Sequence, residues 1–246
     1  MRNAVPEKIN PPTNDIEGIL LLNKPTGKTS FQLVATLRKK LGVRKIGHAG
    51  TLDPFATGVM VMLIGRNYTK LSDSFLCNDK EHIAEIKLGM STDSHDCDGE
   101  TIDTSDHVPS LEDIMSNLVY FQGEIEQVPP MFSAKKVNGK KLYEMARKGQ
   151  TIERKAVRIT VQTELLEYSY PFVRIRVSCS KGTYIRCIAH ELGQRLGCGG
   201  HLSALERTRS GNFPICDCLH WDAVQDGTKE TLQLNLRRSP FNSNSR

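Results

Sequence analysis

The stretch GHAGTLDPFATG, residues 47–58, places one carboxylate, Asp53, among residues that favour tight turns. Glycine adopts backbone conformations that other residues avoid, and proline fixes its own φ angle, so the three glycines and Pro54 predict a compact loop. A basic pair, Arg44 and Lys45, precedes the loop. Loops on a rigid scaffold often bear catalytic side chains. Asp-Pro is also ordinary turn chemistry, so the rest of the chain decides between a functional loop and a plain turn.

Two apolar runs flank this loop and predict buried strands. They are EGILLL at residues 17–22 and VMVMLI at residues 59–64. The second run closely follows Asp53, so the carboxylate is expected beside a rigid strand. Between the first run and the loop, Thr29 or Ser30 is expected to cap a helix that Gly42 ends. The expected apolar face of that helix is Phe31, Val34, Leu37 and Leu41.

Downstream periodicities predict further strands and helices. Strands are expected at residues 81–88, 157–166 and 172–179, and helices at residues 111–121, 139–148 and 184–196. Ser110 is expected to cap the first of these helices, whose apolar residues are Leu111, Ile114, Leu118 and Phe121. Strands and helices therefore both contribute to the core.

Composition indicates a globular protein with reduced thiols. Hydrophobic residues make up 38% and charged residues 25% of the chain, and no apolar run approaches the roughly 18 residues that a membrane-spanning helix requires. The seven cysteines are odd in number and scattered, which argues against a disulfide framework. Residues 1–16 are polar, so we expect a disordered lead and not a signal peptide. We expect a cytoplasmic protein without a membrane partner.

Three local patterns suggest ligands and are rejected. GKT at residues 27–29 resembles the end of a phosphate-binding loop, but Leu22 stands where that motif requires glycine. The stretch at residues 93–100 resembles a calcium loop but lacks its first and last carboxylates, so we expect an acidic surface turn. Cys216, Cys218 and His220 lack a second pair of ligands, so no metal site is predicted.

Basic residues gather after two consecutive prolines. Between residues 133 and 155 the chain has eight basic and two acidic residues. Such a segment is a candidate surface for tracking the phosphates of a nucleic acid. A solvated charged face is the alternative, and the net charge of +5 is too small to decide.

Four motifs in a fixed order resemble the TruB family of tRNA pseudouridine synthases, the bacterial relatives of the dyskerin-type enzymes. They are NKPTGKTS at residues 23–30, GHAGTLDP at 47–54, PPMFSA at 129–134 and CSKGTYIR at 179–186. The resemblance covers about residues 17–211. It implies an α+β (mixed α/β) pseudouridine synthase fold with a largely antiparallel central sheet, flanking helices and an active-site cleft. The implied activity is isomerisation of one uridine in the T-arm of tRNA, of the position 55 type, to pseudouridine.

The same resemblance implies roles for individual residues. Asp53 becomes the catalytic carboxylate, Arg186 its ion-pair partner, and Tyr184 a ring in the uracil site. The segment at residues 130–155 corresponds to the RNA-gripping thumb of the family. The implied substrate-binding residues are His48, Lys80, His82 and Tyr184, and the implied RNA-binding residues are Lys24, Lys135, Lys136, Lys140, Lys141 and Arg147.

Two features depart from the family pattern. His82 stands where the family has a tyrosine that stacks on the target base, and imidazole stacks over a smaller area. Because imidazole titrates near neutrality and tyrosine does not, we expect any extra acid-side limb in the rate profile to vanish in a His82→Tyr variant. The family also often ends in an RNA-binding domain of the PUA type, for which residues 212–246 are too few. We expect a short extension whose end, residues 232–246, is too polar to fold alone.

The chemistry of the residues agrees with the implied reaction. Isomerisation breaks a C–N glycosidic bond and forms a C–C bond without redox change, so neither a cofactor nor a metal is expected. A carboxylate can attack the ribose or the base, or remove a proton, and the sequence does not choose among these roles. The main alternative is a tRNA-binding or folding-assisting protein with little catalysis, while a metal-dependent hydrolase built on Asp53 and His48 lacks a ligand triad. We expect a monomer whose partner is the T-arm stem-loop.

Overall fold

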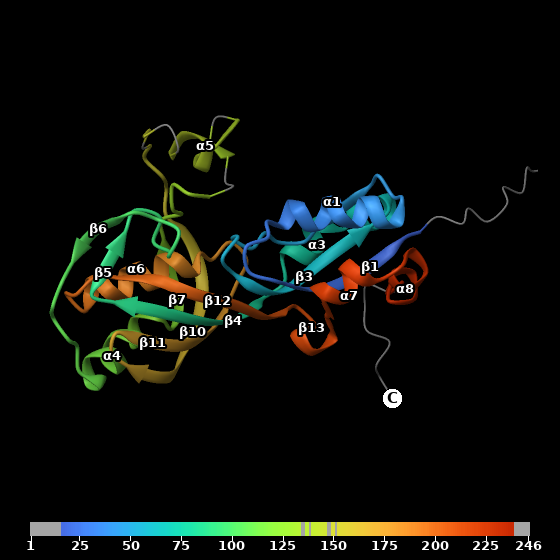
Figure 1. The fold of residues 1–246 in the computed structure, drawn as a ribbon. Coiled ribbons are helices and arrows are strands. Elements are labelled where there is room, and N and C mark those ends of the chain that lie inside the picture. Colours follow the sequence, from blue (N-terminus) through green and yellow to red (C-terminus); the bar gives the residue numbers. More distant parts are fainter. Residues whose placement is uncertain (1–15, 134–135, 138, 147–148, 151, 239–246) are drawn as a thin grey trace, which may run out of the picture.

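One large sheet runs through the molecule in this computed structural model (Figure 1). The structure describes residues 16–133, 136–137, 139–146, 149–150 and 152–238. Within them the sheet has ten strands in the order β14-β1-β3-β12-β4-β11-β10-β7, with β2 paired to β3 and β13 to β12. The strands are β1 Gly18–Lys24, β2 Ile46–His48, β3 Thr57–Ile64, β4 Lys80–Leu88, β7 Gly123–Gln127, β10 Val157–Ser169, β11 Phe172–Cys179, β12 Gly200–Ser210, β13 Phe213–Pro214 and β14 Leu219–His220.

Most neighbouring strands of this sheet run antiparallel, while the β1–β14 and β3–β12 pairs are parallel. The predicted mixed α/β class with a largely antiparallel sheet is confirmed, as are all five predicted strands. The sequence analysis does not predict β12, because GHLSALERTRS shows no clear alternation of apolar and polar residues. This strand nevertheless lies at the centre of the sheet and joins its two halves.

Helices cover the sheet where their sequences present apolar stripes. Helix α1 spans Ser30–Leu41, with Thr29 as its N-cap and Gly42 in the left-handed conformation at its C-terminus, as predicted. The other longer helices are α4, Leu111–Leu118, and α6, Ile185–Arg195. No helix among the described residues is long and apolar enough to cross a membrane. The shorter elements are α2 Arg66–Thr69, α3 Ser72–Leu76, α5 Leu142–Ala146, α7 Trp221–Asp226, α8 Lys229–Leu234, β5 Met90–Thr92, β6 Thr101–Thr104, β8 Lys136–Val137, β9 Lys140–Lys141 and the 3-10 turns Val119–Phe121 and Ile215–Asp217.

Two residues that the sequence pattern places in the core are exposed in the structure. Phe31 is 67% exposed, and Leu33 takes a place in the core of α1 instead. Leu111 is 50% exposed at the first position of α4, where Ile114, Leu118 and the following Phe121 are buried. Both errors occur in the first turn of a helix, where an apolar residue can match the spacing of three and four residues and still lie beyond the edge of the core.

The end of the chain packs on the main sheet. Strand β14 pairs with β1, and the backbone groups of Arg237 exchange hydrogen bonds of 2.8 and 2.9 Å with Ile19. Leu232 of α8 is 1% exposed in the main core. The described part of the polar end, residues 232–238, is therefore held by the sheet, and residues 239–246 lie outside the described residues.

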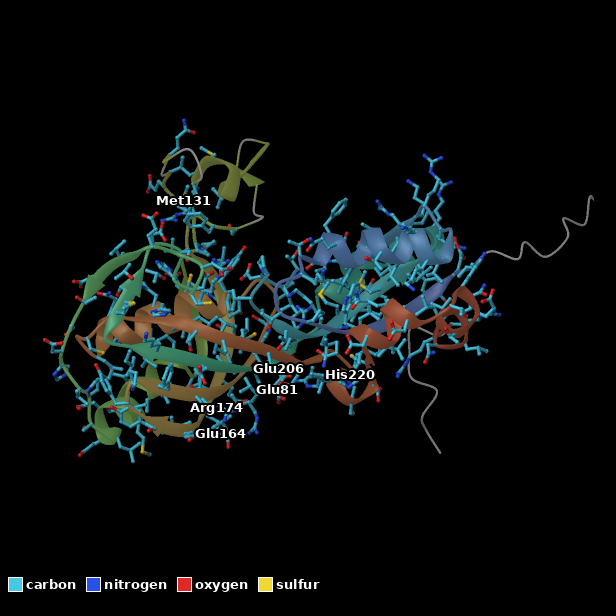
Figure 2. All side chains as sticks on the ribbon, viewed as in Figure 1. Glu81, Met131, Glu164, Arg174, Glu206 and His220 are labelled. Atoms are coloured by element: carbon cyan, nitrogen blue, oxygen red, sulfur yellow. The ribbon has the colours of Figure 1, made fainter. Side chains whose placement is uncertain are left out.

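The outer face of strands β10 and β11 carries exposed charges (Figure 2). Arg174 lies 3.4 Å from Glu167, and Arg176 pairs with Glu164, each across the two antiparallel strands. Exposed ion pairs contribute little to stability because water screens them. This part of the face is therefore a solvated, charged surface.

Gly58 closes the loop of residues 47–58 against β12, and we expect Gly58→Ala to be strongly destabilising. Its φ angle is +102°, and a Cβ atom there would lie 2.2 Å from the carbonyl oxygen of Arg207. Strained backbone and overpacking each cost on the order of 1–3 kcal/mol, so we expect the free energy of unfolding to fall by about 3 kcal/mol in urea titrations. Gly27→Ala is the matched control, because Gly27 has a φ angle of +78° and a Cβ atom there would meet nothing within 4 Å. Equal losses for the two variants would show that the contact with β12 is unimportant.

Candidate active site

The loop between β2 and β3 carries Asp53, and buried polar groups bind the backbone of this loop. Ser30 Oγ accepts a hydrogen bond of 3.1 Å from the Leu52 backbone N–H, and the Gly27 N–H donates to the Pro54 carbonyl at 2.8 Å. These contacts connect the loop to the N-terminus of α1. The loop is thereby fixed on two sides of the carboxylate.

Lys24 is one of these buried groups, which corrects its expected role as an RNA contact. Its side chain is fully buried, and its Nζ donates to the carbonyls of Pro25, Pro54 and Ala56 at 2.9, 3.0 and 2.5 Å. Burial lowers the pKa of Lys24 to about 8, against the opposing effect of Asp53. An ammonium group without exposed surface cannot contact a phosphate, so Lys24 supports the loop that carries Asp53.

Arg207 of β12 is a second buried cation under the loop, and the sequence analysis missed it. It is 2% exposed and donates to the carbonyls of Val59 at 2.7 Å and Gly50 at 3.2 Å. No carboxylate among the described residues forms an ion pair with it. Burial lowers its pKa to about 10, which leaves it charged at neutral pH. The loop therefore rests on two cations that bind its backbone oxygens.

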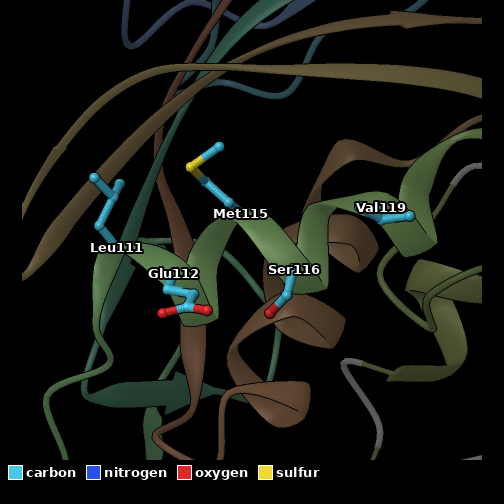
Figure 3. A pocket seen from close by; sticks show the side chains of 5 residues that line it. All are labelled: Leu111, Glu112, Met115, Ser116 and Val119. Carbon is cyan, nitrogen blue, oxygen red and sulfur yellow. The ribbon is translucent and has the colours of Figure 1, made fainter.

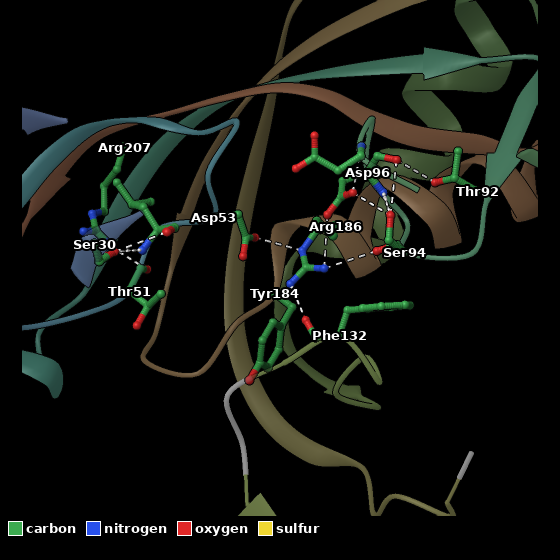
Figure 4. A network of polar contacts seen from close by, with 12 residues as sticks. Ser30, Thr51, Asp53, Thr92, Ser94, Asp96, Phe132, Tyr184, Arg186 and Arg207 are labelled. Atoms are coloured by element: carbon green, nitrogen blue, oxygen red, sulfur yellow. Dashed lines mark hydrogen bonds and ion pairs between the residues drawn. The ribbon is translucent and has the colours of Figure 1, made fainter. Parts of the chain in front are cut away.

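The partly exposed side chain of Asp53 forms an ion pair with Arg186 (Figure 4). Arg186 Nε lies 2.9 Å from Asp53 Oδ2, and the two side chains are 5% and 36% exposed respectively. The second carboxylate oxygen, Oδ1, has no hydrogen-bond partner among the described residues. The carboxylate is thus anchored through one oxygen and presents the other to solvent.

Arg186 is itself fixed by groups from two other segments (Figure 4). Its Nη1 lies 3.2 Å from Asp96 Oδ2 and donates to the Ser94 carbonyl at 3.2 Å, and its Nη2 donates to the Phe132 carbonyl at 2.8 Å. Asp96 is 4% exposed. A guanidinium group that is bound through all three of its nitrogens has little freedom to rotate, so the orientation of Asp53 is set by the whole set of contacts.

The expected acidic surface turn at residues 93–100 is wrong in its inner half. Asp93 and Asp98 are exposed, but Ser94 and Asp96 face inward, and Ser94 Oγ donates to Asp96 Oδ1 at 2.5 Å. No strand alternation predicts this burial, because β5 ends at Thr92 and the next residues form a turn with His95 at a φ angle of +65°. The density of carboxylates alone suggests only a calcium loop or a surface turn.

The ionisation of Asp53 reflects two opposing effects. Burial raises the pKa of its carboxyl group above the ordinary value, and the Arg186 guanidinium opposes that rise. Asp96 and Asp98 add to the increase through repulsion. The carboxylate is therefore more basic than an exposed aspartate while it remains paired, which suits a group that attacks or removes a proton.

His48 and Tyr184 lie at the edges of the same region. His48 is the last residue of β2, and burial, with the nearby charge of Arg207, lowers the pKa of its imidazole. Tyr184 precedes α6, and Gln127 binds its backbone twice, accepting from the N–H at 2.8 Å and donating to the carbonyl at 3.1 Å. Gln127 was missed by the sequence analysis. It fixes the start of the helix that carries Arg186.

Lys80 and His82 lie on β4 and face inward. Lys80 Nζ donates to the Leu76 carbonyl at 2.9 Å, and burial lowers its pKa. His82 is 6% exposed, with Nδ1 3.9 Å from Cys179 Sγ, and burial lowers its pKa to about 3. In this conformation the lowered pKa keeps the His82 ring neutral near pH 7, and an acid-side limb that a His82→Tyr variant loses stays a prediction. Stacking of this ring on the target base remains a prediction, and in this conformation little of its surface is open.

The basic thumb-like segment is described only in part. Lys135 and Arg147 lie outside the described residues, and the backbones of Lys136, Lys140 and Lys141 form the small hairpin of β8 and β9. The predicted helix at residues 139–148 is shorter, because its first residues pair as a strand and α5 spans Leu142–Ala146. Figure 2 shows Met131 where the chain leaves the sheet towards α5.

A depression outside the contacts of Arg186 is mostly apolar. A depression of about 560 Å³ lies on one face of α4, lined by Leu111, Glu112, Met115, Ser116 and Val119 (Figure 3). It has one carboxylate and no partner for it among its lining residues. No cluster of three or more histidine, cysteine or acidic side chains suited to a metal ion is found in the part of the chain that the structure describes.

A buried guanidinium and a loop carboxylate on a mixed sheet are typical of a site for acid–base or covalent chemistry, and comparison with known proteins assigns the class. The model of the TruB family pseudouridylate synthase N-terminal domain matches residues 38–185, and that of the tRNA pseudouridylate synthase B C-terminal domain matches residues 186–239. The chain belongs to the TruB family of pseudouridine synthases, which confirms the resemblance seen in the four motifs.

Individual relatives agree with this assignment. The tRNA pseudouridine synthase B of Protochlamydia amoebophila is 60% identical over 94% of this chain and 87% of its own length. The protein of the same name from Chlamydia pneumoniae is 61% identical over 82% of this chain and 86% of its own. Among solved structures, a chain of a Cbf5-Nop10-Gar1 complex has a TM-score of 0.68 at 30% identity, covering 90% of this chain and 60% of that one. This chain thus spans about three fifths of that solved relative.

Proposed function

We propose that this protein converts one uridine in the T-arm of tRNA, of the position 55 type, to pseudouridine, with Asp53 as the essential carboxylate. The observation that carries the proposal is the 2.9 Å pair of Asp53 with a buried Arg186 whose other nitrogens are already bound. Relatives at 60% identity are named tRNA pseudouridine synthase B, which supports tRNA as the substrate class. The T-arm position follows from the family resemblance of the four sequence motifs.

The arrangement suits a reaction on a base that has left its stack. A uridine inside a folded RNA has to be extruded before a protein side chain can reach it. Asp53 Oδ1 faces outward, so it is free to attack the ribose or the base, or to remove a proton, while Oδ2 stays on Arg186. Because the guanidinium favours the ionised carboxylate, the group is kept in the form that each of these roles requires.

The test is pseudouridine formation in a T-arm stem-loop incubated with the full chain. Pseudouridine has the mass of uridine, so the product is detected by carbodiimide tagging and primer extension. We expect one stop at the target uridine and none in a stem-loop with cytidine at that position. Tight binding of the stem-loop without any tag would instead support a tRNA-binding or folding-assisting protein.

The basic segment is proposed to bind the RNA backbone. Replacing Lys135, Lys136, Lys140 and Lys141 together with Ala is expected to weaken tRNA binding and to flatten its salt dependence. Each phosphate contact that is lost reduces the slope of log K against log salt by about one unit, through counterion release. Filter binding at several salt concentrations measures the slope. The control replaces Arg158, Arg174 and Lys229, which are exposed on β10, β11 and α8, and an equal slope change there would indicate a general charge effect.

A further inference from the structure

Two histidines stack on one another beside the Asp53–Arg186 pair. The ring centroids of His95 and His190 lie 3.8 Å apart, and the ring planes differ by 1°. Neither Nδ1 atom has a hydrogen-bond partner among the described residues, although both atoms are buried. Buried polar atoms normally find partners, so this pair is held by ring contact and not by hydrogen bonds.

The stack joins the turn at residues 94–96 to α6, as the contacts of Arg186 also do. His95 lies between Ser94 and Asp96, both of which contact Arg186. His190 lies on α6 one turn after Arg186. Because residues four apart share a helix face, the stack clamps the turn onto α6 directly beside the contacts that hold Arg186.

The backbone of the turn needs such a clamp. His95 has a φ angle of +65°, in the left-handed region that is uncommon for residues other than glycine. The carbonyl of His95 accepts a hydrogen bond of 3.0 Å from the Leu202 N–H, which ties the turn to β12. The stack supplies the second anchor, on the side of α6.

The charges around the stack favour neutral rings. Burial, followed by repulsion from His190, Arg186 and Arg154, lowers the pKa of His95 to about 4. Burial also lowers the pKa of His190, against the opposing effect of Glu191. The carboxylate of Asp96, on the same turn, is occupied by Arg186 and Ser94. A proton on His95 would therefore add a third cation close to the guanidinium groups of Arg186 and Arg154.

We propose that His95 and His190 are a positioning pair that holds Asp96 and Ser94 on Arg186, and thereby orients Asp53, only while both rings are neutral. Neither ring is placed on the reacting atoms. The inference rests on the proposed role of Asp53, and it adds a part of the site that is built from two residues distant in the sequence.

The test compares variants that lose the ring with one that keeps it. His190→Ala and His95→Asn each remove a ring, and Asn tolerates the left-handed backbone of residue 95. We expect each to slow single-turnover pseudouridine formation about tenfold with the Kd for tRNA within about twofold, since the RNA contacts are untouched. His190→Phe retains an aromatic stack and is expected to restore the rate to within about threefold of wild type. The double variant should be no slower than either single variant, because the two rings act as one unit.

Acidification gives a second readout. Below about pH 6.5 the unfolded histidines take up protons that the folded rings exclude, so the contribution of the stack to stability is present at neutral pH and is lost as the pH falls. We expect the acid-side fall in rate of His190→Phe to lie at lower pH than that of wild type. His107→Ala, which removes an exposed histidine outside the site, should leave the profile unchanged.

The outcomes separate this inference from the proposed function. If Asp53→Asn is inactive but His190→Ala and His95→Asn turn over at the wild-type rate, the stack has no positioning role. If His190→Phe is as slow as His190→Ala while both melt like wild type, ring stacking is not the property that matters, and the proposal fails. An active Asp53→Asn would contradict the proposed function itself.

Discussion

Replacing Asp53 with Asn is expected to lower the single-turnover rate of pseudouridine formation by more than about 10³-fold, the scale that loss of an acid–base or nucleophilic group produces. The amide has the shape of the carboxylate but is neither a nucleophile nor a base. The affinity for tRNA should stay within about twofold, because among the described residues the side chain of Asp53 has no hydrogen-bond or ion-pair partner apart from Arg186. Rapid-quench assays with tagged stem-loop give the rate, and filter binding gives the Kd.

We also expect Asp53→Asn to affect the stability of the fold. The folded pKa of Asp53 is raised above its unfolded value, so between the two values the native state binds more protons than the unfolded state. Its carboxylate therefore lowers stability as the pH rises through that window, and the neutral amide removes this effect. We expect Asp53→Asn to melt no lower than wild type at neutral pH, with the difference shrinking in acid.

The matched control for Asp53 is Asp98→Asn. Asp98 is an exposed carboxylate near the same guanidinium, and its side chain has no hydrogen-bond partner among the described residues. Its replacement removes one nearby negative charge without removing the group that faces the substrate. Similar rates for the Asp53 and Asp98 variants would show that only the local charge matters, and Asp53 would lose its assigned role.

Local patterns in the sequence were sufficient for most elements of the fold. The capped helix α1 follows from a period of 3.6 residues, the buried strand β3 from a continuous apolar run, and strand β11 from a period of two residues. Strand β12 was missed because its sequence lacks a clear alternation of apolar and polar residues and includes Arg207, a charged residue whose burial no period reveals. Arg207 donates to the backbone carbonyl of Val59, which lies almost 150 residues earlier in the chain.

The residues of the candidate site were also predicted only in part. The pairing of Asp53 with Arg186 was expected because each stands in a recognisable motif. Asp96 stands in a stretch that resembles a surface turn, and its contact with Arg186 joins positions 90 residues apart. Lys24 was misjudged for the opposite reason, because a lysine in a motif suggests a phosphate contact, whereas the loop carbonyls of Pro54 and Ala56 satisfy its ammonium group. Tertiary contacts of charged side chains are the part that a single sequence does not reveal.

Two buried cations keep the shape of the loop although the pKa of the Asp53 carboxyl group is raised. Lys24 and Arg207 bind backbone oxygens on both sides of Asp53, at Gly50 and at Pro54. These contacts do not depend on whether Asp53 is ionised. The loop can therefore hold its position whether the carboxylate is ionised or protonated.

Arg186→Lys is expected to slow turnover by about 10²-fold or more, although it keeps the positive charge. A lysine ammonium group is a point charge and cannot bind Asp53, Asp96 and the Phe132 carbonyl in the directions that a planar guanidinium group reaches. Asp96→Asn leaves the guanidinium in place on its carbonyl partners, so its rate loss should be smaller. Single-turnover rates measured well below the melting temperature of each variant establish the order. If Arg186→Lys retained the wild-type rate, charge alone would be sufficient, and the fixed orientation of Asp53 would not contribute to catalysis.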